Sequence, residues 1–422
     1  MKTAIPKVIV IGGGFAGLWA TRALAKSYCD ITLIDKQNHH LFQPLLYQVA
    51  TAGLSSGDIA APLRHILRGQ ANVEVRLGEV INIELTEKLI KLADSSELSF
   101  DYLLIASGAT HAYFDKSEWA EHAPGLKTLD DALNIRRKIL LAFEKAETCT
   151  SKEEQDAWLH FAVIGGGPTG VELAGTLAEI AKHTLKNEFR NIDPTKARVR
   201  LIEAGSRILS AFPESLSASA TKQLERLGVE VCCGKPVTNI SSNDYSLAEQ
   251  TVQAKTVLWA AGVAASPLGK LLETPLDKAG RVIVENDLSL ANFPAIFVAG
   301  DLASVTCNAK PVPGVAPAAK QMGKHVATAI QAKIDGQPTS AFKYQDFGNL
   351  ATIGRLSAIV DVRGVKFSGV FAWLFWLAAH VFFLIGFRNR ISVLINWGWA
   401  YFSYERHARV IYGGGKDDRR QP

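Results

Sequence analysis

Cysteine is scarce in this chain, which has five cysteines among 422 residues. Their number is odd, and none of them forms a CxxC pair or has the spacing of a zinc site. These absences exclude a disulfide-stapled secreted domain and a structural zinc module. They also exclude an enzyme that works through a CxxC or CxxxxC dithiol, and they favour a chain whose thiols stay reduced, as in the cytosol.

The chain also lacks a strong charge imbalance and a hydrophobic leader. Its net charge is +5, and residues 367–422 contain seven Lys or Arg and three Asp or Glu, so +4 of the excess lies there. The rest is nearly neutral, which argues against nucleic-acid binding and for a local anionic partner. The first apolar run, at 8–11, is too short for the apolar region of a signal peptide, so we expect it to be a strand.

A strand–turn–helix–strand pattern opens the chain. Four β-branched residues at 8–11 predict a buried strand, and the glycine-rich run 12–17 predicts a tight turn into a helix over 18–26. A second β-rich run, 30–34, ends at Asp35. This order is typical of the βαβ unit that binds dinucleotides.

The residue types within this pattern fit that chemistry. Gly12 allows the tight turn, Gly14 lets the backbone approach a pyrophosphate, and Gly17 lets the helix pack closely on the strand. The helix N-terminus offers unpaired N–H groups to the phosphates. Asp35 can accept hydrogen bonds from a ribose diol, so the unit predicts a bound dinucleotide.

The same pattern appears a second time, 153 residues later. A strand at 161–164 leads into the glycines of 165–170 and a helix, and a strand at 199–202 ends at Glu203. The distance from glycine to acid is longer here, because a charged insertion lies at 182–198. The sequence therefore contains an internal repeat of a whole nucleotide-binding unit.

Each unit also has a later strand that ends in small residues, at 106–108 in the first unit and 260–262 in the second. A further buried strand, at 295–298, delivers Asp301 to its carboxyl end, where ligands bind in open α/β sheets. We expect this segment to complete the first domain after the second has been inserted. Two units imply two dinucleotides, most economically a flavin and a nicotinamide nucleotide. The alternative is two tandem domains that never meet.

The segment 39–48 is neither periodic nor strongly polar. It predicts an ordered loop after the second strand. One interpretation is a packed connection. The other, equally weighted, is a wall beside the cofactor, where His40 and Gln43 could reach ribose or phosphate.

The two glycine units, the segment 38–48, the run 166–175 and the aromatic C-terminus closely resemble type II NADH dehydrogenases, the single-subunit, non-proton-pumping NADH:quinone oxidoreductases. The resemblance implies FAD in the first unit, NADH in the second, a membrane quinone (ubiquinone or menaquinone) as acceptor, and a membrane-bound homodimer. Where the family often has a first glutamine near the quinone, this chain has Pro317; Gln321 keeps the second.

The resemblance also implies roles for individual residues. FAD contacts are expected from Gly12, Gly13, Gly14, Phe15, Ala16, Gly17, Asp35, Lys36, His39, His40, Gln43, Val80, Ala106, Gly108, Asp301, Ala319 and Lys366. NADH contacts are expected from Gly165, Gly167, Pro168, Thr169, Gly170, Glu172, Glu203, Ala261 and Gly262, and quinone contacts from Gln48, Lys320 and Gln321. The catalytic residues it implies are Glu172, Gln321 and Lys366.

Three of these residues have competing interpretations. Glu172 is either a carboxylate favoured by the dipole in the first turn of its helix or, by resemblance, a group that influences hydride transfer and the flow of protons to quinone. Glu203 should accept ribose hydroxyls and reject a 2′-phosphate, although Arg207 could pair with such a phosphate. Lys366 is a membrane-surface anchor, a cation near the flavin ring, or both.

The C-terminal region has an uncharged run over 367–387 and a second aromatic run over 397–404. Its length reaches the roughly 20 residues of a transmembrane helix, but Ser368, Gly369 and His380 interrupt the run, and a span would move the basic tail across the membrane. We therefore favour an interfacial anchor over a span. A buried dimer interface is a third interpretation.

The sequence thus predicts an α/β protein with two Rossmann-like domains, the second inserted in the first, and a C-terminal helical membrane-anchoring segment. The expected boundaries are 1–115 and 286–345 for the FAD-binding domain, 116–285 for the NADH-binding domain and 346–422 for the anchor. We expect a flavoenzyme that oxidises NADH with quinone, peripheral on the cytoplasmic face of the inner membrane. The alternatives are a sulfide:quinone reductase-like flavoprotein and a non-catalytic NADH-binding redox sensor.

Overall fold

A computed structural model of the chain describes residues 4–406 and 408–411. It contains two compact units. The first comprises Ala60–Thr110, Val263–Phe347 and the described part of Met1–Leu41; the second comprises Phe42–Ile59, His111–Gly262 and the described part of Gly348–Pro422. The predicted domain boundaries stay predictions, and most of the predicted basic tail, residues 412–422, lies outside the described residues.

The first unit is built on a six-stranded sheet with the order β20-β21-β9-β1-β2-β5. Its central strand β1 (Lys7–Ile11) pairs in parallel with β2 (Asp30–Asp35) and β9 (Tyr102–Ile105), with Val8 opposite both Ile31 and Tyr102. Parallel strands are covered on both faces, which explains why β1 consists of Val and Ile after its exposed first residue, Lys7.

The chain returns to this sheet after the second nucleotide unit. The strand β21 (Phe293–Val298) pairs in parallel with β9, and the short β20 (Ser289–Leu290) forms the antiparallel edge. The opposite edge is β5 (Val73–Leu77). The expectation that the segment before Asp301 completes the first sheet is therefore confirmed.

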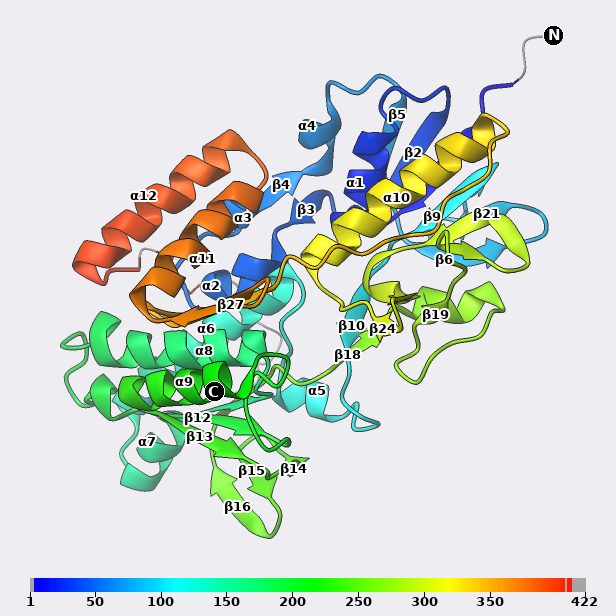
Figure 1. The fold of residues 1–422 in the computed structure, drawn as a ribbon. Coiled ribbons are helices and arrows are strands. Elements are labelled where there is room, and N and C mark those ends of the chain that lie inside the picture. The colour runs from blue at the N-terminus through cyan, green and yellow to red at the C-terminus, as the bar shows by residue number, and fades with distance from the viewer. Residues whose placement is uncertain (1–3, 407, 412–422) are drawn as a thin grey trace. The chain divides into compact units, whose positions relative to one another are not determined.

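Helices α1 (Phe15–Ala23) and α10 (Ala316–Ile334) pack against one another in this unit and run side by side in Figure 1. A methyl group added at Gly323 would overlap the backbone of Ala16. The small residue at this point lets the two helix backbones approach closely.

The remaining elements of the first unit connect or flank this core. They are β3 (His39–Leu41), β4 (Ala60–Pro62), α4 (Leu63–Leu67), β6 (Val80–Glu84), β7 (Leu89–Leu92), β8 (Glu97–Ser99), β10 (Ala109–His111), β18 (Val263–Ala265), β19 (Val282–Ile283), β22 (Ala303–Ser304), β23 (Thr306–Cys307) and β24 (Lys310–Pro311).

The second unit repeats the design with a four-stranded parallel sheet in the order β13-β12-β11-β17. The strand β11 (His160–Ile164) lies between β12 (Arg198–Glu203) and β17 (Thr256–Trp259), and β13 (Val229–Cys233) is the edge. Helices α8 (Pro168–Glu179) and α9 (Glu214–Leu227) lie side by side on it (Figure 1).

An antiparallel sheet of three strands, β25 (Asn349–Gly354), β26 (Ser357–Val362) and β27 (Val365–Ser368), packs on α8. The contact is close, because a methyl group at Gly175 of α8 would overlap the carbonyl of Ile353. The three-stranded sheet therefore packs directly against the backbone of α8.

The other elements of the second unit are α2 (Leu46–Ala50), α3 (Ser56–Ile59), α5 (Trp119–His122), α6 (Leu129–Thr148), α7 (Lys152–Trp158), β14 (Val237–Ile240), β15 (Asp244–Leu247) and β16 (Gln250–Gln253). The predicted insertion after α8 begins in a π-helical turn, Ile180–Thr184, and contains a 3₁₀ turn, Pro194–Lys196.

The uncharged run of the C-terminal region is divided among three elements. Its start belongs to β27, its centre forms α11 (Val370–Phe383), and α12 (Phe387–Ser403) begins after a turn at Gly386, whose φ is +94°. Within residues 4–406 and 408–411, no helix is both long and apolar enough to cross a bilayer.

The close contact at Gly175 generates a stability prediction. Gly175→Ala should lower the free energy of unfolding by about 1–3 kcal/mol, since overpacking outweighs the gain in helix propensity. The matched control is Gly398→Ala on α12, where a methyl group meets nothing within 4 Å, so the same change should be neutral or stabilising. Thermal midpoints of both variants measure the effect, and an unchanged Gly175→Ala midpoint would contradict the close contact.

Candidate active site

The first glycine turn is closed by its own acid. Gly13 N–H donates to Asp35 Oδ2 at 2.5 Å, and Gln37 N–H donates to Asp35 Oδ1 at 2.7 Å. Burial raises the pKa of Asp35, and the two N–H groups oppose that shift. The carboxylate therefore fixes the turn and keeps lone pairs for a ribose diol.

The glycines of this turn serve two different purposes. A methyl group at Gly12 or Gly17 would overlap protein backbone, whereas one at Gly14 meets nothing within 4 Å. Gly12 also has a φ of +101°, which side chains disfavour. Gly12 and Gly17 are therefore required by packing, whereas the space at Gly14 is open for a ligand.

His40 borders the same turn. Its Nδ1 lies 2.9 Å from the carbonyl oxygen of Gly13, so Nδ1 carries the proton and Nε2 presents a lone pair. Burial lowers the pKa of His40 to about 4, so the ring is neutral. Nε2 is buried and finds no partner in the described part of the chain. A hydroxyl group of a bound nucleotide would satisfy it.

Other predicted FAD contacts gather around the ends of neighbouring strands in this unit. Ala106 packs against Gly12, Gly108 follows with a φ of +70° and open space, and Asp301 follows β21. Ala319 lies beside Gly300, and Val80 is buried on β6. Lys36 is exposed, and His39 Nδ1 lies 3.0 Å from Asn38 Oδ1.

Two predicted FAD contacts belong to the second unit instead. Gln43 Nε2 donates to the carbonyl of Lys127 at 3.1 Å, and Lys366 is exposed on β27. Their roles stay predictions.

The second glycine turn has the same construction as the first. Gly166 N–H donates to Glu203 Oε2 at 2.6 Å, and Gly205 N–H donates to Glu203 Oε1 at 2.7 Å. A methyl group at Gly165 or Gly170 would overlap protein backbone, whereas one at Gly167 meets nothing within 4 Å. We call the two turns with their acids the first and second cradle, at residues 12–17 with Asp35 and 165–170 with Glu203.

Arg207 does not offer its guanidinium to the second cradle. Its Nη1 donates to the carbonyl of Phe212 at 2.8 Å, and its Nη2 donates to the carbonyl of Ser210 at 2.8 Å. The guanidinium of Arg207 is therefore engaged by backbone carbonyls.

Glu172 is the most strongly perturbed acid near the second cradle. It is the fifth residue of α8, so the expectation that it lies in the first helical turn is wrong. It is buried, with 8% exposure, and burial raises its pKa well above the usual value, opposed by the Thr352 backbone N–H. Burial therefore favours the protonated form of this carboxyl group, which a role in helix-dipole stabilisation does not explain.

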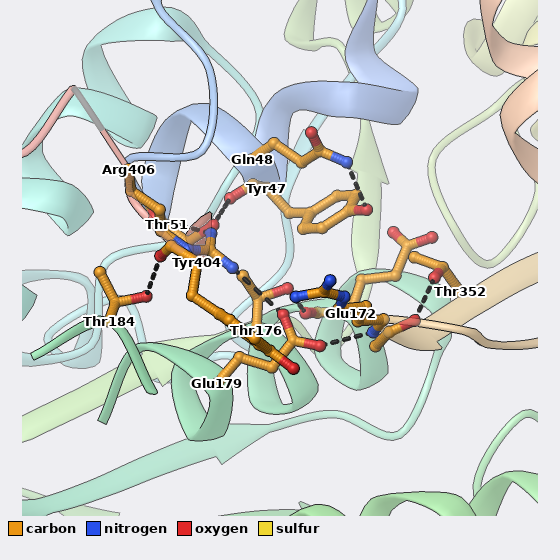
Figure 2. A network of polar contacts seen from close by, with 12 residues as sticks. Tyr47, Gln48, Thr51, Glu172, Thr176, Glu179, Thr184, Thr352, Tyr404 and Arg406 are labelled. Carbon is orange, nitrogen blue, oxygen red and sulfur yellow. Dashed lines mark hydrogen bonds and ion pairs between the residues drawn. The ribbon is translucent and has the colours of Figure 1, made fainter. Parts of the chain in front are cut away.

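Polar side chains converge beside Glu172 between α2, α8 and the C-terminal segment (Figure 2). Gln48 Nε2 donates to Tyr47 Oη at 2.9 Å, and Trp397 Nε1 donates to Gln48 Oε1 at 2.7 Å. Arg406 pairs with Glu179 at 3.2 Å and donates to the carbonyl of Thr51 at 3.1 Å. The contacts of Trp397 and Arg406 join chain segments more than 200 residues apart within one unit.

A cavity of about 120 Å³ opens among these residues. Six of its lining residues are aromatic. The Arg355 guanidinium lies over the rings of Tyr401 and Tyr404, at 4.3 and 4.0 Å from their centres. Trp376 and Arg355 both line it, and the buried donors Trp376 Nε1 and Arg355 Nη1 have no hydrogen-bond partner in the described residues. An aromatic cavity with unpaired donors suits a flat ligand that carries carbonyl oxygens.

The predicted quinone residues fall in different units. Gln48 lines the cavity of the second unit, whereas Lys320 and Gln321 belong to α10 in the first. Gln321 exchanges two hydrogen bonds of 2.9 Å with the backbone of Gln345, and Lys320 Nζ lies 4.0 Å from the ring centre of Trp19.

Sequence reasoning missed Tyr47, Thr352, Arg355, Trp376 and Arg406. No spacing in the sequence connects residue 47 with residues near 400. The sequence offers one signal for Arg406, which is its position shortly after the aromatic run 397–404. All five cysteines are free, and within the described residues no group of His, Cys, Asp or Glu could hold a metal ion.

Comparisons with known proteins agree with this geometry. Residues 6–323 match the family model for pyridine nucleotide-disulphide oxidoreductases, and residues 347–403 match the NDH2 C-terminal domain. Two type II NADH:quinone oxidoreductases of Mycobacterium tuberculosis, Ndh and NdhA, are 43% and 44% identical over 96% of this chain and 90% and 89% of their own lengths.

Among solved structures, NDH2 from Plasmodium falciparum in complex with NADH has a TM-score of 0.87 at 21% identity, covering 97% of this chain and 100% of that one. The sulfide:quinone oxidoreductase of Aquifex aeolicus has a TM-score of 0.74 at 18% identity, covering 92% of each chain. These likenesses concern the fold. Together with the family models and the mycobacterial relatives, they lead to the conclusion that this chain belongs to the type II NADH:quinone oxidoreductase family.

Proposed function

We propose that this enzyme oxidises NADH at the second cradle and passes two electrons through FAD in the first cradle to a membrane quinone. The observation that carries the proposal is the repeated cradle, in which one glycine of each turn borders open space and one carboxylate accepts a hydrogen bond from the turn. The unpaired Nε2 of His40 gives the first cradle an acceptor for a cofactor hydroxyl. When bound, FAD supplies a ring that accepts a hydride and releases two electrons.

The chain's own residues would hold both nucleotides and manage protons. The overall reaction, NADH + H⁺ + quinone → NAD⁺ + quinol, consumes one proton. Glu172 is buried next to the cavity walls of Tyr47 and Thr352, and burial raises its pKa and so favours its protonated form. It is therefore suited to supply that proton. The cavity with the unpaired donors of Trp376 and Arg355 suits the carbonyl groups of a quinone head.

Membrane attachment is the second part of the proposal. The most exposed large apolar side chains of α11 and α12 are Phe371 at 79%, Phe382 at 70% and Phe402 at 85%. Such a density of exposed apolar side chains marks a lipid or protein interface. We infer a peripheral enzyme on the cytoplasmic face of the inner membrane, acting as a homodimer on ubiquinone or menaquinone.

The rival functions have less support. A sulfide:quinone reductase would use redox cysteines, and the five cysteines here are unpaired. A non-catalytic redox sensor would have no need for a buried proton-holding acid beside an aromatic cavity. Replacing NADH by sulfide in the assay below distinguishes the first rival, and failure of quinone to reoxidise the reduced flavin would favour the second.

The central test is a spectrum of the purified protein. It should be yellow from bound flavin, NADH should bleach it, and a quinone analogue should restore the colour. NADPH should have a kcat/KM lower by at least about tenfold, since Glu203 repels a 2′-phosphate. Glu203→Gln should narrow that preference. Absence of flavin, or equal kcat/KM values for the two nucleotides in the native enzyme, would contradict the proposal.

The protonated state of Glu172 makes a pH-dependent prediction. Above the ordinary pKa of glutamate, near 4.5, the unfolded chain releases this proton and the folded protein keeps it. Folding stability is then lost as pH rises toward the folded pKa, by up to about 1.4 kcal/mol per pH unit. Glu172→Gln should remove this loss, so its stability relative to the native enzyme should increase from pH 5 to pH 8, as thermal midpoints at both pH values measure.

Two further measurements complete this test. The exposed Glu214→Gln is the control and should show no such pH trend. Turnover of Glu172→Gln with quinone should fall by about 100-fold, as expected for loss of a positioned proton donor, at unchanged flavin content. A variant with native turnover and no pH trend would return Glu172 to a purely structural role.

The membrane face can be tested by vesicle flotation. The double variant Phe371→Ser and Phe402→Ser should bind vesicles more weakly, because each large side chain contributes about 1.5–3 kcal/mol when fully buried. High salt should not reproduce this loss, since it screens only charges, over about 8 Å at physiological ionic strength. Tyr28→Ser, at an exposed site of the first unit, is the control. Unchanged binding of the double variant would overturn the assignment of this face.

A further inference from the structure

An exposed aromatic ring lies beside the second cradle and has no role in the proposed function. Phe114 is 65% exposed, yet a methyl group added at Gly262 would overlap its ring. One part of the phenyl ring therefore rests on the backbone of Gly262, and the rest faces solvent. Gly262 ends the small-residue run that follows β17.

The order of the strands identifies which half of a dinucleotide this position faces. The pyrophosphate of a bound nucleotide lies at the glycine turn after β11, and the acid at the end of β12 takes the adenosine ribose. Since β17 lies on the other side of β11, the nicotinamide half extends toward the end of β17. The backbone of Ala260 and Ala261 already contacts Gly165 there.

The loop that carries Phe114 is firmly attached to this strand end. The Tyr113 ring stacks on Trp259 with 5.1 Å between ring centres, and Tyr113 Oη donates to the carbonyl of Ala123 at 2.9 Å. Trp259 Nε1 donates to the carbonyl of Ala112 at 3.0 Å. The ring therefore has a built position, with support from the two residues that precede it.

The backbone at this loop is also unusual. Phe114 and Asp115 have φ values of +49° and +65°, a left-handed conformation that residues other than glycine adopt at a cost. Two consecutive residues of this kind hold an apolar ring partly in water. The ring also packs on Trp259, with 6.1 Å between ring centres. Most of it nevertheless stays exposed, and this exposed part points to a function in ligand binding.

The first unit provides an internal comparison. Its corresponding strand-end glycine, Gly108, has a φ of +70°, close to the +77° of Gly262, but a methyl group there meets nothing within 4 Å. The same backbone feature is thus open in the first unit and covered by a ring in the second. The cover is a specific addition to the second cradle.

We propose that Phe114 covers the nicotinamide half of the nucleotide bound at the second cradle and positions its ring by stacking. The inference rests on the proposed binding of NADH at this cradle. Aromatic faces stack on flat heterocycles, and they attract a cation such as the pyridinium ring of NAD⁺. Phe114 is therefore a positioning residue for the nicotinamide, whereas Glu203 selects the adenosine ribose.

The experiment compares two ligands that differ only in the nicotinamide. Binding of NAD⁺ and of ADP-ribose to the FAD-loaded enzyme is measured calorimetrically for native protein, Phe114→Ala and Phe114→Tyr. Phe114→Ala should weaken NAD⁺ binding by about 5- to 10-fold, the lower range for loss of a stacked ring, and leave ADP-ribose binding unchanged. Phe114→Tyr should retain both affinities, and the control Tyr28→Ala should affect neither.

Two results would overturn this inference while leaving the proposed function intact. Equal losses for NAD⁺ and ADP-ribose would mean that Phe114 only supports the fold of the cradle, and native affinities in Phe114→Ala would mean that the ring does not touch the nucleotide. If the native enzyme bound neither ligand, the proposed function itself would fail, and this inference with it. If Phe114 positions the nicotinamide, Phe114→Ala should raise KM for NADH by a larger factor than it lowers kcat.

Discussion

The hydrogen bond from the middle glycine of each turn to the acid of the neighbouring strand is the constraint on which both cradles depend. Gly13 donates to Asp35 in one unit, and Gly166 donates to Glu203 in the other. Each bond joins the loop that we propose to hold phosphates to the carboxylate that we propose to hold a ribose. The distance between the two ligand groups is therefore set within the protein before any nucleotide binds, and binding has little left to order.

Most of this framework could be predicted from the sequence, because the determinants are local. Runs such as Val8–Ile11 specify buried strands, and the glycine spacing specifies a turn that only small residues can form. Even the return of the chain at β21 was predictable, since a buried strand that delivers an acid has few places to pair. The helix after the second turn was placed slightly wrong, because Pro168 begins it and carries Glu172 into the second turn.

The site around Glu172 was less predictable, because it depends on contacts between distant segments. The state of this acid is set by burial under β25, and the surrounding network brings Gln48 to Trp397 and Glu179 to Arg406. No periodicity marks such pairs. The uncharged run 367–387 likewise looked continuous, whereas the glycines at 369 and 386 bound a shorter helix between a strand and a second helix.

The engagement of Arg207 has a consequence for redesigning the coenzyme preference. Its guanidinium closes the turn after β12 through the carbonyls of Ser210 and Phe212. Replacing Glu203 alone would remove repulsion without providing a cation for a 2′-phosphate. Recruiting Arg207 for that purpose would leave those carbonyls without their donors, and the loop would lose its shape. A switch of coenzyme therefore requires a new basic residue from elsewhere on the loop, so specificity here is a property of the whole turn.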